Sequence, residues 1–253
     1  MKLALISDLH SNREALEAVW THARAQGVDE LACLGDVVGY GPDPEFCIDL
    51  VRENASWCLM GNHDEAVFRD ASDFNSYART AIEFTRKRLE PRWFGSTVRR
   101  ARWRWLQSLP LTHRVGRFHF YHGSPRDPVR EYVLSTDGIL NPAKLQAIYE
   151  CFDGVGFAGH THQPGMHDSD FRWHGLQGAD SLTLPLPERT KCFVNVGSTG
   201  QPRDGDPRAC YAILEDHQVT WHRVVYDLRR TQEKILAARV LPELLARRLE
   251  VGR

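Results

Sequence analysis

Residues 2–10 read KLALISDLH, an apolar run that leads directly into an acidic residue and a histidine. A short apolar run bounded by polar residues predicts a buried strand, so we expect one over residues 2–7. Asp8 and His10 stand two positions apart at its end, where an extended backbone would point both side chains to the same side. The segment therefore predicts two polar side chains held together at the carboxyl end of a core strand.

The same arrangement recurs further along the chain. A predicted strand over residues 30–34 leads into GD at 35–36, and another over residues 56–60 leads into GNHD at 61–64. Helical segments separate these strands, which predicts crossover connections and a largely parallel sheet. Functional loops of such a sheet gather beyond the carboxyl ends of its strands. We therefore expect the three polar motifs to meet at one edge.

Two later motifs, YHG at 121–123 and GHTH at 159–162, add further histidines. Carboxylates, a carboxamide oxygen and imidazoles together suit a borderline divalent ion such as manganese, iron, cobalt, nickel or zinc. The six cysteines include no C-x-x-C pair, which argues against a thiolate zinc site and favours small buried side chains in a reducing cytoplasm.

The order of these five motifs resembles that of the calcineurin-like metallophosphoesterase family, which carries Asp-x-His, Gly-Asp, Gly-Asn-His-Asp/Glu, a single His and Gly-His-x-His. The resemblance runs from about Ile6 to Arg203. The segments GYGP at 39–42 and NVGS at 195–198 resemble the small stand-alone bacterial branch. The fold that the resemblance implies is α/β (α+β), a four-layer sandwich of two mixed β-sheets flanked by helices.

The resemblance also implies two divalent metal ions, with Mn²⁺ as the first choice and Fe, Ni, Co or Zn as alternatives. A hydroxide shared by the two ions would attack the phosphorus. Asp36 would bridge the ions. The first ion would be held by Asp8, His10, Asp36 and His162, and the second by Asp36, Asn62, His122 and His160.

His63 stands beside the proposed ligand Asn62, and the resemblance implies that it donates a proton to the leaving group. We expect Asp64 to orient His63. These two residues complete the predicted catalytic set.

Three further residues are candidates for binding substrate, each with a structural alternative. Arg126 is close enough in sequence to His122 to reach a phosphate, or it forms a salt bridge with Asp127. Asn12 caps the following helix in the alternative interpretation, and Tyr40 packs on its loop. Arg203 lies in a turn rich in Pro and Gly and is interpreted as structural.

The function implied is hydrolysis of phosphate diesters or monoesters of small molecules or nucleotides. The stretch GDVVGYG at 35–41 lacks the Asp-Arg pair of the protein phosphatases in this superfamily, which favours a small phosphorylated substrate. A catalytically weak binding scaffold of the same fold is one alternative. A nuclease or nucleic-acid-binding protein is another, because segment 86–105 mixes arginines with aromatic residues. Helical spacing favours inward packing of those aromatics instead.

Composition and charge narrow the choice of partners. The chain has 253 residues, 42% of them hydrophobic, and a formal net charge of -1, so it lacks a global basic footprint for nucleic acid. Its apolar start is too short for a signal peptide or a membrane span. We expect one cytoplasmic domain over residues 1–253.

The rest of the chain supplies the remaining elements. Residues 175–189 are the most loop-like stretch. A helix is expected over 11–26, where Ser11 and Glu14 form a capping-box pattern, and another is expected to begin at Pro44. A flanking or cap segment at about 66–110 is expected to be helical, with an interruption near Pro91 and Gly95. A C-terminal helical segment is expected at about 228–249, with a break near Pro242. Strands of a second sheet are expected over 117–121, 154–158, 193–196, 209–214 and 219–225.

Overall fold

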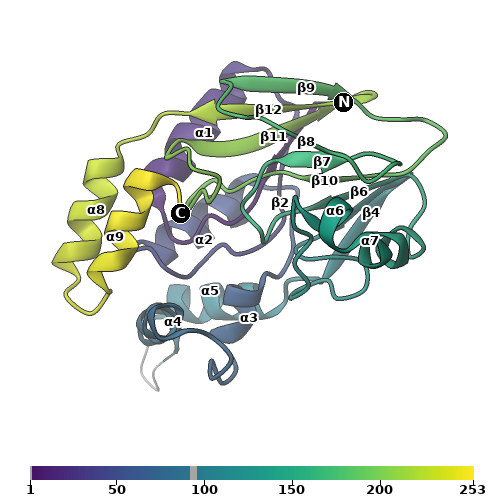
Figure 1. The fold of residues 1–253 in the computed structure, drawn as a ribbon. Helices are drawn as coiled ribbons and strands as arrows, with labels where there is room; N and C mark the ends of the chain where they lie inside the picture. Colours follow the sequence, from purple (N-terminus) through teal and green to yellow (C-terminus); the bar gives the residue numbers. More distant parts are fainter. Residues whose placement is uncertain (1, 92–95) are drawn as a thin grey trace.

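The computed structural model describes residues 2–91 and 96–253, and within them the strands form two mixed six-stranded sheets (Figure 1). The first sheet has the order β3 (Trp57–Cys58), β2 (Glu30–Cys33), β1 (Lys2–Ile6), β11 (Ala209–Glu215), β12 (Gln218–Val224) and β9 (Ser181–Pro185). The second has the order β4 (Thr112–Val115), β5 (Phe118–Tyr121), β6 (Val155–Ala158), β10 (Cys192–Asn195), β7 (Gly165–His167) and β8 (Trp173–Gly175).

Each sheet has a parallel centre and antiparallel additions. β1, β2 and β3 run parallel, as do β5, β6 and β10, so the motif loops follow parallel strands in both sheets. The prediction that 209–214 and 219–225 belong to the second sheet is wrong, because β11 pairs with β1 and β12 pairs with β11. Almost every residue of β11 is buried, which suits a central strand covered on both faces.

Alternation along β1 divides its side chains between two cores. Leu3 and Leu5 face the second sheet and pack in one cluster with Phe120 and Phe157. Ala4 and Ile6 point the other way, toward the helices on the outer face of the first sheet. The apolar run that opens the chain is therefore buried on both faces, which a strand between a second sheet and a helical layer requires.

Helices form the two outer layers. α1 (Arg13–Ala25) and α2 (Pro44–Asn54) pack on the first sheet, and α7 (Pro142–Tyr149) packs on the second, next to α6 (Asp137–Leu140). The remaining helices are α3 (Asn62–Ala66), α4 (Ser76–Leu89), α5 (Thr97–Gln107), α8 (Leu228–Ala237) and α9 (Glu243–Val251). The order helix, sheet, sheet, helix confirms the predicted four-layer sandwich.

The start of α1 differs from the predicted one. Asn12, and not Ser11, is the N-cap, with its Oδ1 accepting from the Ala15 N–H at 3.2 Å. Ser11 has φ +54°, outside the extended region that an N-cap residue usually adopts. The carboxylate of Glu14 turns instead to Lys234 and Thr231 of α8.

Other differences concern the periphery. The stretch 175–189, predicted as loop, contains the end of β8 and all of β9, an edge strand whose residues alternate between exposed and half-buried. The predicted helical segment forms α4 and α5, and its expected break at Gly95 lies outside the described residues. The break at Pro242 is observed, since that residue is the N-cap of α9. In the part of the chain that the structure describes, no helix is both long and apolar enough to cross a membrane.

Candidate metal centre

Loops at the ends of parallel strands bring the predicted ligands together. Asp8 and His10 follow β1, Asp36 follows β2, His122 follows β5, and His160 and His162 follow β6, while Asn62 opens α3 after β3. All seven of these side chains are buried. Their convergence at one edge agrees with the expectation from the sequence that functional loops gather there.

The backbone of these loops is left-handed rather than extended. Asp8, His10, Asp36, His160 and His162 all have φ between +46° and +63°. A residue with a Cβ atom adopts this region at a cost of about 1–2 kcal/mol. The expected extended path from Asp8 to His10 is thus wrong, although both side chains still point into one cluster. Strain of this kind gathers at functional sites, where the surrounding structure holds it in place.

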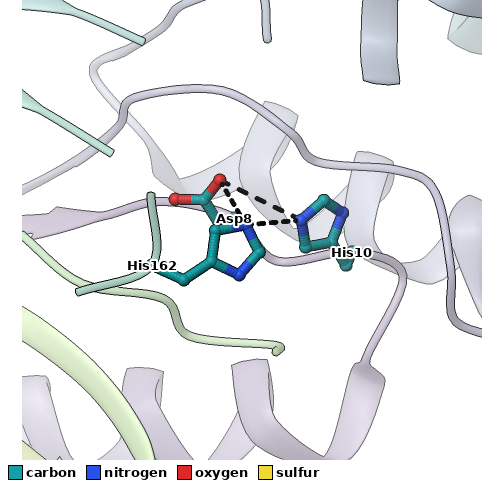
Figure 2. Close-up of side chains that lie close together, drawn as sticks. All are labelled: Asp8, His10 and His162. Atoms are coloured by element: carbon teal, nitrogen blue, oxygen red, sulfur yellow. Dashed lines mark hydrogen bonds and ion pairs between the residues drawn. The ribbon is translucent and has the colours of Figure 1, made fainter. Parts of the chain in front are cut away.

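The first group of donors consists of Asp8, His10 and His162 (Figure 2). Nε2 of His162 lies 3.2 Å from Oδ1 of Asp8 and 3.2 Å from Nε2 of His10. Oδ1 of Asp8 is buried without a well-formed hydrogen bond from any described residue. An unsatisfied carboxylate oxygen that faces two imidazole nitrogens fits a bound cation, because each atom can donate an electron pair.

The second group consists of Asp36, His122 and His160. Oδ2 of Asp36 lies 3.5 Å from Nε2 of His122 and 3.7 Å from Nε2 of His10, so its carboxylate lies between the two groups. Oδ1 of Asn62 approaches Nε2 of His122 at 3.1 Å. Asp36 also belongs to a third group of close donors with His10 and His63, so its carboxylate can contribute to more than one set of ligands.

Backbone carbonyl groups orient the imidazole rings. Nδ1 of His10, His122 and His162 contacts the carbonyl oxygens of Val38, Leu34 and Gln201, respectively. When Nδ1–H donates to a carbonyl, the lone pair of Nε2 is left to face the cluster, as in histidine metal ligands. The two ring nitrogens of His160 have exchanged roles. Its Nε2 contacts the carbonyl oxygen of Arg130 at 3.1 Å, which leaves Nδ1 with the lone pair that can bind a metal ion.

The protonation states that burial and nearby charges favour differ among these side chains. Burial disfavours the charged form of Asp36, but neighbouring His122 and His63 outweigh it and hold the pKa of Asp36 well below its usual range. Burial and the nearby charge of His122 lower the pKa of His160 to about 3. Although burial opposes it, the carboxylate of Asp36 raises the pKa of His122 to about 9. A cation would take the place of that proton, so the donor set fits a divalent metal ion.

His63 lies beside this cluster with its backbone N–H bonded to Oδ1 of Asp36 at 2.8 Å. Its ring is buried against Tyr40, at 4.4 Å between ring centroids, and against the backbone of Gly39. Among the described hydrogen bonds, none joins the Asp64 carboxylate to the His63 ring. The Asp64 carboxylate accepts from the N–H groups of Val37, Val38 and Gly61 and so ties the loop after β2 to the loop after β3.

A pocket of about 270 Å³ opens beside the cluster. Four of the proposed ligands and His63 contribute to its lining, namely Asp36, Asn62, His160 and His162 with His63. The other lining residues are Tyr40, Asp73, Phe74, Asn75, Ala78, Arg130, Tyr132, Arg203 and Arg248.

Of the three predicted substrate contacts, only Tyr40 lines this pocket. Arg126 is paired with Glu131 at 3.1 Å, rather than with Asp127, and Asn12 serves as the N-cap of α1 and donates to the carbonyl oxygen of Gly200. Arg203, which the sequence led us to interpret as structural, does line the pocket, and so does Arg248 from the C-terminal helix.

The basic and aromatic segment 86–105 is used largely for packing. Arg88 forms a two-pronged ion pair with Glu45, and Arg102 pairs with Asp49 in the same way. Trp103 packs edge to face on Phe68. Three basic or aromatic residues of the segment 86–105, Arg92, Trp93 and Phe94, lie outside the described residues. The contacts seen are those of a helix pair fixed to α2 and α3.

Comparisons with known proteins place these observations in context. Residues 1–218 match the sequence model of the calcineurin-like phosphoesterase superfamily domain. An uncharacterized protein of Methanocaldococcus jannaschii is 34% identical over 260 residues, covering 99% of this chain and 98% of that protein. The crystal structure of a metallophosphoesterase from Sphaerobacter thermophilus is similar with a TM-score of 0.85 and 37% identity, and the match covers 100% of both chains. A hypothetical protein from Pyrococcus horikoshii shares the fold, with a TM-score of 0.77, 17% identity and coverage of 100% of this chain and 98% of that one.

Proposed function

Because the chain belongs to the calcineurin-like phosphoesterase superfamily, we propose that it is a hydrolase that cleaves phosphate diesters or monoesters of small molecules in a metal-dependent reaction. One observation carries this proposal. Carboxylate and imidazole donors from loops far apart in the sequence converge in one buried cluster, where the Asp36 carboxylate lies near His10 and His122 and the carboxamide oxygen of Asn62 approaches His122.

Two divalent ions, Mn²⁺ in the first instance, would be held by these donors. The first would take Asp8, His10, Asp36 and His162, and the second Asp36, Asn62, His122 and His160. Bound there, divalent ions supply activation of water and neutralisation of phosphoryl charge.

The chain's own residues then supply the proton. A water adds to phosphorus and releases a proton to solvent, and as the P–O ester bond breaks His63 gives its own proton to the departing oxygen. Burial lowers the pKa of His63 to about 4, with Asp36 acting in the opposite direction.

The residues around His63 hold it in place. Gly39 gives its ring room, since a Cβ atom at Gly39 would lie 2.6 Å from Nδ1 of His63. Asp64 fixes the loop that carries His63 by accepting three backbone N–H groups. In this proposal Asp64 is a positioning residue that acts through the loop.

We also propose that residues 1–253 form one domain that works in the cytoplasm. Ligands drawn from residue 8 to residue 162 meet in one cluster, which supports a single folding unit. All six cysteines are free, as expected in a reducing compartment.

The test is hydrolysis of bis(p-nitrophenyl) phosphate and p-nitrophenyl phosphate by metal-free protein to which Mn²⁺ is added. We expect release of p-nitrophenol that depends on the ion and stops with a chelator. The control variant Asp49→Asn, which removes an ion pair with Arg102 outside the pocket lining, keeps the rate. Absence of hydrolysis with Mn, Fe, Co, Ni and Zn in turn would contradict the proposal and favour a binding scaffold.

A further inference from the structure

Two arginines in the pocket wall lie close to one aromatic ring. The guanidinium carbons of Arg203 and Arg248 are 5.7 and 5.9 Å from the centroid of the Tyr40 ring. Arg203 donates to the hydroxyl of Tyr40 at 3.3 Å and to Oε1 of Gln201 at 2.9 Å. Arg248 donates through Nε at 2.7 Å to a main-chain oxygen of Arg253, the last residue of the structure, where that oxygen belongs to a carboxylate, so Arg203 is the guanidinium of the two without an anionic partner among the described residues. Within the described parts of the chain, no Asp or Glu side chain forms an ion pair with either guanidinium.

Neighbouring arginines show how unusual this is. Arg130 lines the same pocket but is paired with Glu65 at 2.7 Å and Asp73 at 3.5 Å. Arg247, next to Arg248 on α9, is paired with Glu243 at 2.7 Å. Like charges near one another in a half-buried place repel when no anion offsets them. Burial and the charge of Arg203 accordingly lower the pKa of Arg248. The arrangement would be stabilised by an anion, which a guanidinium can grip through two oxygens.

The arginine pair lies beside the metal ligands rather than among them. The Tyr40 ring is 4.7 Å from the His10 ring and 4.4 Å from the His63 ring, measured between centroids. The backbone N–H of Arg203 bonds to the carbonyl oxygen of His162, which anchors it next to the cluster. The hydrogen bonds of the two guanidinium groups that the structure describes go to Gln201, Tyr40 and Arg253, and to none of the seven ligand side chains.

Arg248 comes from a part of the chain beyond the family match, which ends at residue 218. α8 and α9 pack on each other beside α1, at the left of Figure 1. α8 is fixed to the sheet domain by Lys234, which pairs with Glu14 and Asp43, and by Thr231, which donates to Asn12. This helical pair therefore holds an additional cationic group at a pocket that is also lined by residues of the family's motifs.

We propose that Arg203 and Arg248 bind a second phosphate group of the substrate, so that the compound cleaved here carries at least two phosphates, one at the metal centre and one at the arginine pair. The inference rests on the proposed function and adds the substrate class. The pocket then places cations around both anionic groups of one small molecule.

Pyrophosphate binding to the metal-free protein tests the pair without the metal ions, by calorimetric titration against inorganic phosphate as the reference ligand. We expect wild type to bind pyrophosphate more tightly than phosphate. Arg203→Gln and Arg248→Gln should each weaken pyrophosphate binding about tenfold to a hundredfold, because each removes charged hydrogen bonds. Arg248→Lys, which keeps the charge without the planar fork, should recover part of the loss.

Arg247→Gln is the matched control, one residue away on the same helix and already paired with Glu243, and it should bind as wild type does. Equal affinity of wild type for both ligands, or pyrophosphate binding that neither pocket variant weakens, would overturn the inference. Circular dichroism of each variant shows that it is folded. Hydrolysis of both nitrophenyl esters by wild type is measured in parallel with Mn, Fe, Co, Ni and Zn in turn. If hydrolysis occurs while the titrations fail, only the second phosphate site is refuted, and if neither ester is cleaved with any of these metals the proposed function itself is refuted.

Discussion

One side of the pocket carries buried carboxylates and the other carries half-buried guanidinium groups, and the two kinds of charge have different surroundings. On one side, Asp8 and Asp36 lie among imidazole rings in strained loops that follow the strands. On the other side, Arg203 and Arg248 flank Tyr40, and no Asp or Glu side chain of the described residues pairs with either guanidinium. The first arrangement suits cations and the second suits anions. The proposed metal ligands are thus positioned by loops that follow strands, whereas one of the two guanidinium groups is added by a C-terminal helix.

The largest expected effect comes from breaking the ligand side at its shared residue. Asp36→Asn removes the carboxylate that lies near both groups, so activity with Mn²⁺ should fall about a thousandfold or more, since the loss of a metal ion costs several kcal/mol of transition-state stabilisation. Steady-state hydrolysis of bis(p-nitrophenyl) phosphate measures it. A variant that retains a tenth of the wild-type rate would show that Asp36 is not shared.

Removing the proposed acid should separate catalysis from metal binding. His63→Asn should lower kcat about a hundredfold to ten-thousandfold, the usual contribution of general acid catalysis. Its metal content, measured by elemental analysis, should equal that of wild type. Loss of an ion would instead make His63 a ligand, a role that its place near His10 and Asp36 also permits.

A smaller effect is expected when His63 is displaced rather than removed. Gly39 has φ +101°, and an added Cβ atom would lie 2.6 Å from Nδ1 of His63, so Gly39→Ala should lower kcat about tenfold with the metal retained. Gly178→Ala is the control, because Gly178 has φ +83° with nothing within 4 Å of the added atom. The two variants share the backbone strain and differ in the contact. Equal activities would refute the positioning role of Gly39.

The smallest effect concerns stability away from the pocket. On β12, burial, the nearby charge of His22 and the charge of Lys2 lower the pKa of His222 to about 4. A histidine whose folded pKa lies below its unfolded value of about 6.5 contributes stability above pH 6.5 and loses it as pH falls toward 4. His222→Gln should therefore lose less stability than wild type between pH 7 and pH 4.5, measured by urea unfolding. An unchanged pH dependence would refute this assignment.

The ligand side could be predicted from sequence because each donor directly follows a strand. A buried apolar run ends at the edge of its sheet, so Asp8 and Asp36 lie at one edge of the first sheet because β1 and β2 are parallel. His160 follows β6 of the second sheet, and its approach depends on how the two sheets pack. The backbone conformation of the loops was not predictable in this way, and the extended path expected from Asp8 to His10 is left-handed in the structure.

The side of the pocket formed by Arg203 and Arg248 could not be predicted, because these two residues are brought together by tertiary packing. Arg203 lies in a turn and Arg248 on an amphipathic helix, and neither position distinguishes a pocket residue from a solvated one. The packing of α8 on α1 and of α9 on α8 determines that Arg248 lines the pocket. For the same reason the pairing of β11 with β1 could not be predicted from the sequence, since an apolar run indicates a buried strand without indicating which strand it pairs with.

The most direct test of the account is a calorimetric titration of metal-free wild-type protein with Mn²⁺, followed by elemental analysis of the loaded protein. The account predicts two ions per chain in wild type and fewer in Asp36→Asn, with Asp49→Asn equal to wild type. Binding of no ion by wild type, or the same stoichiometry in Asp36→Asn, would contradict a centre in which this carboxylate joins two metal sites.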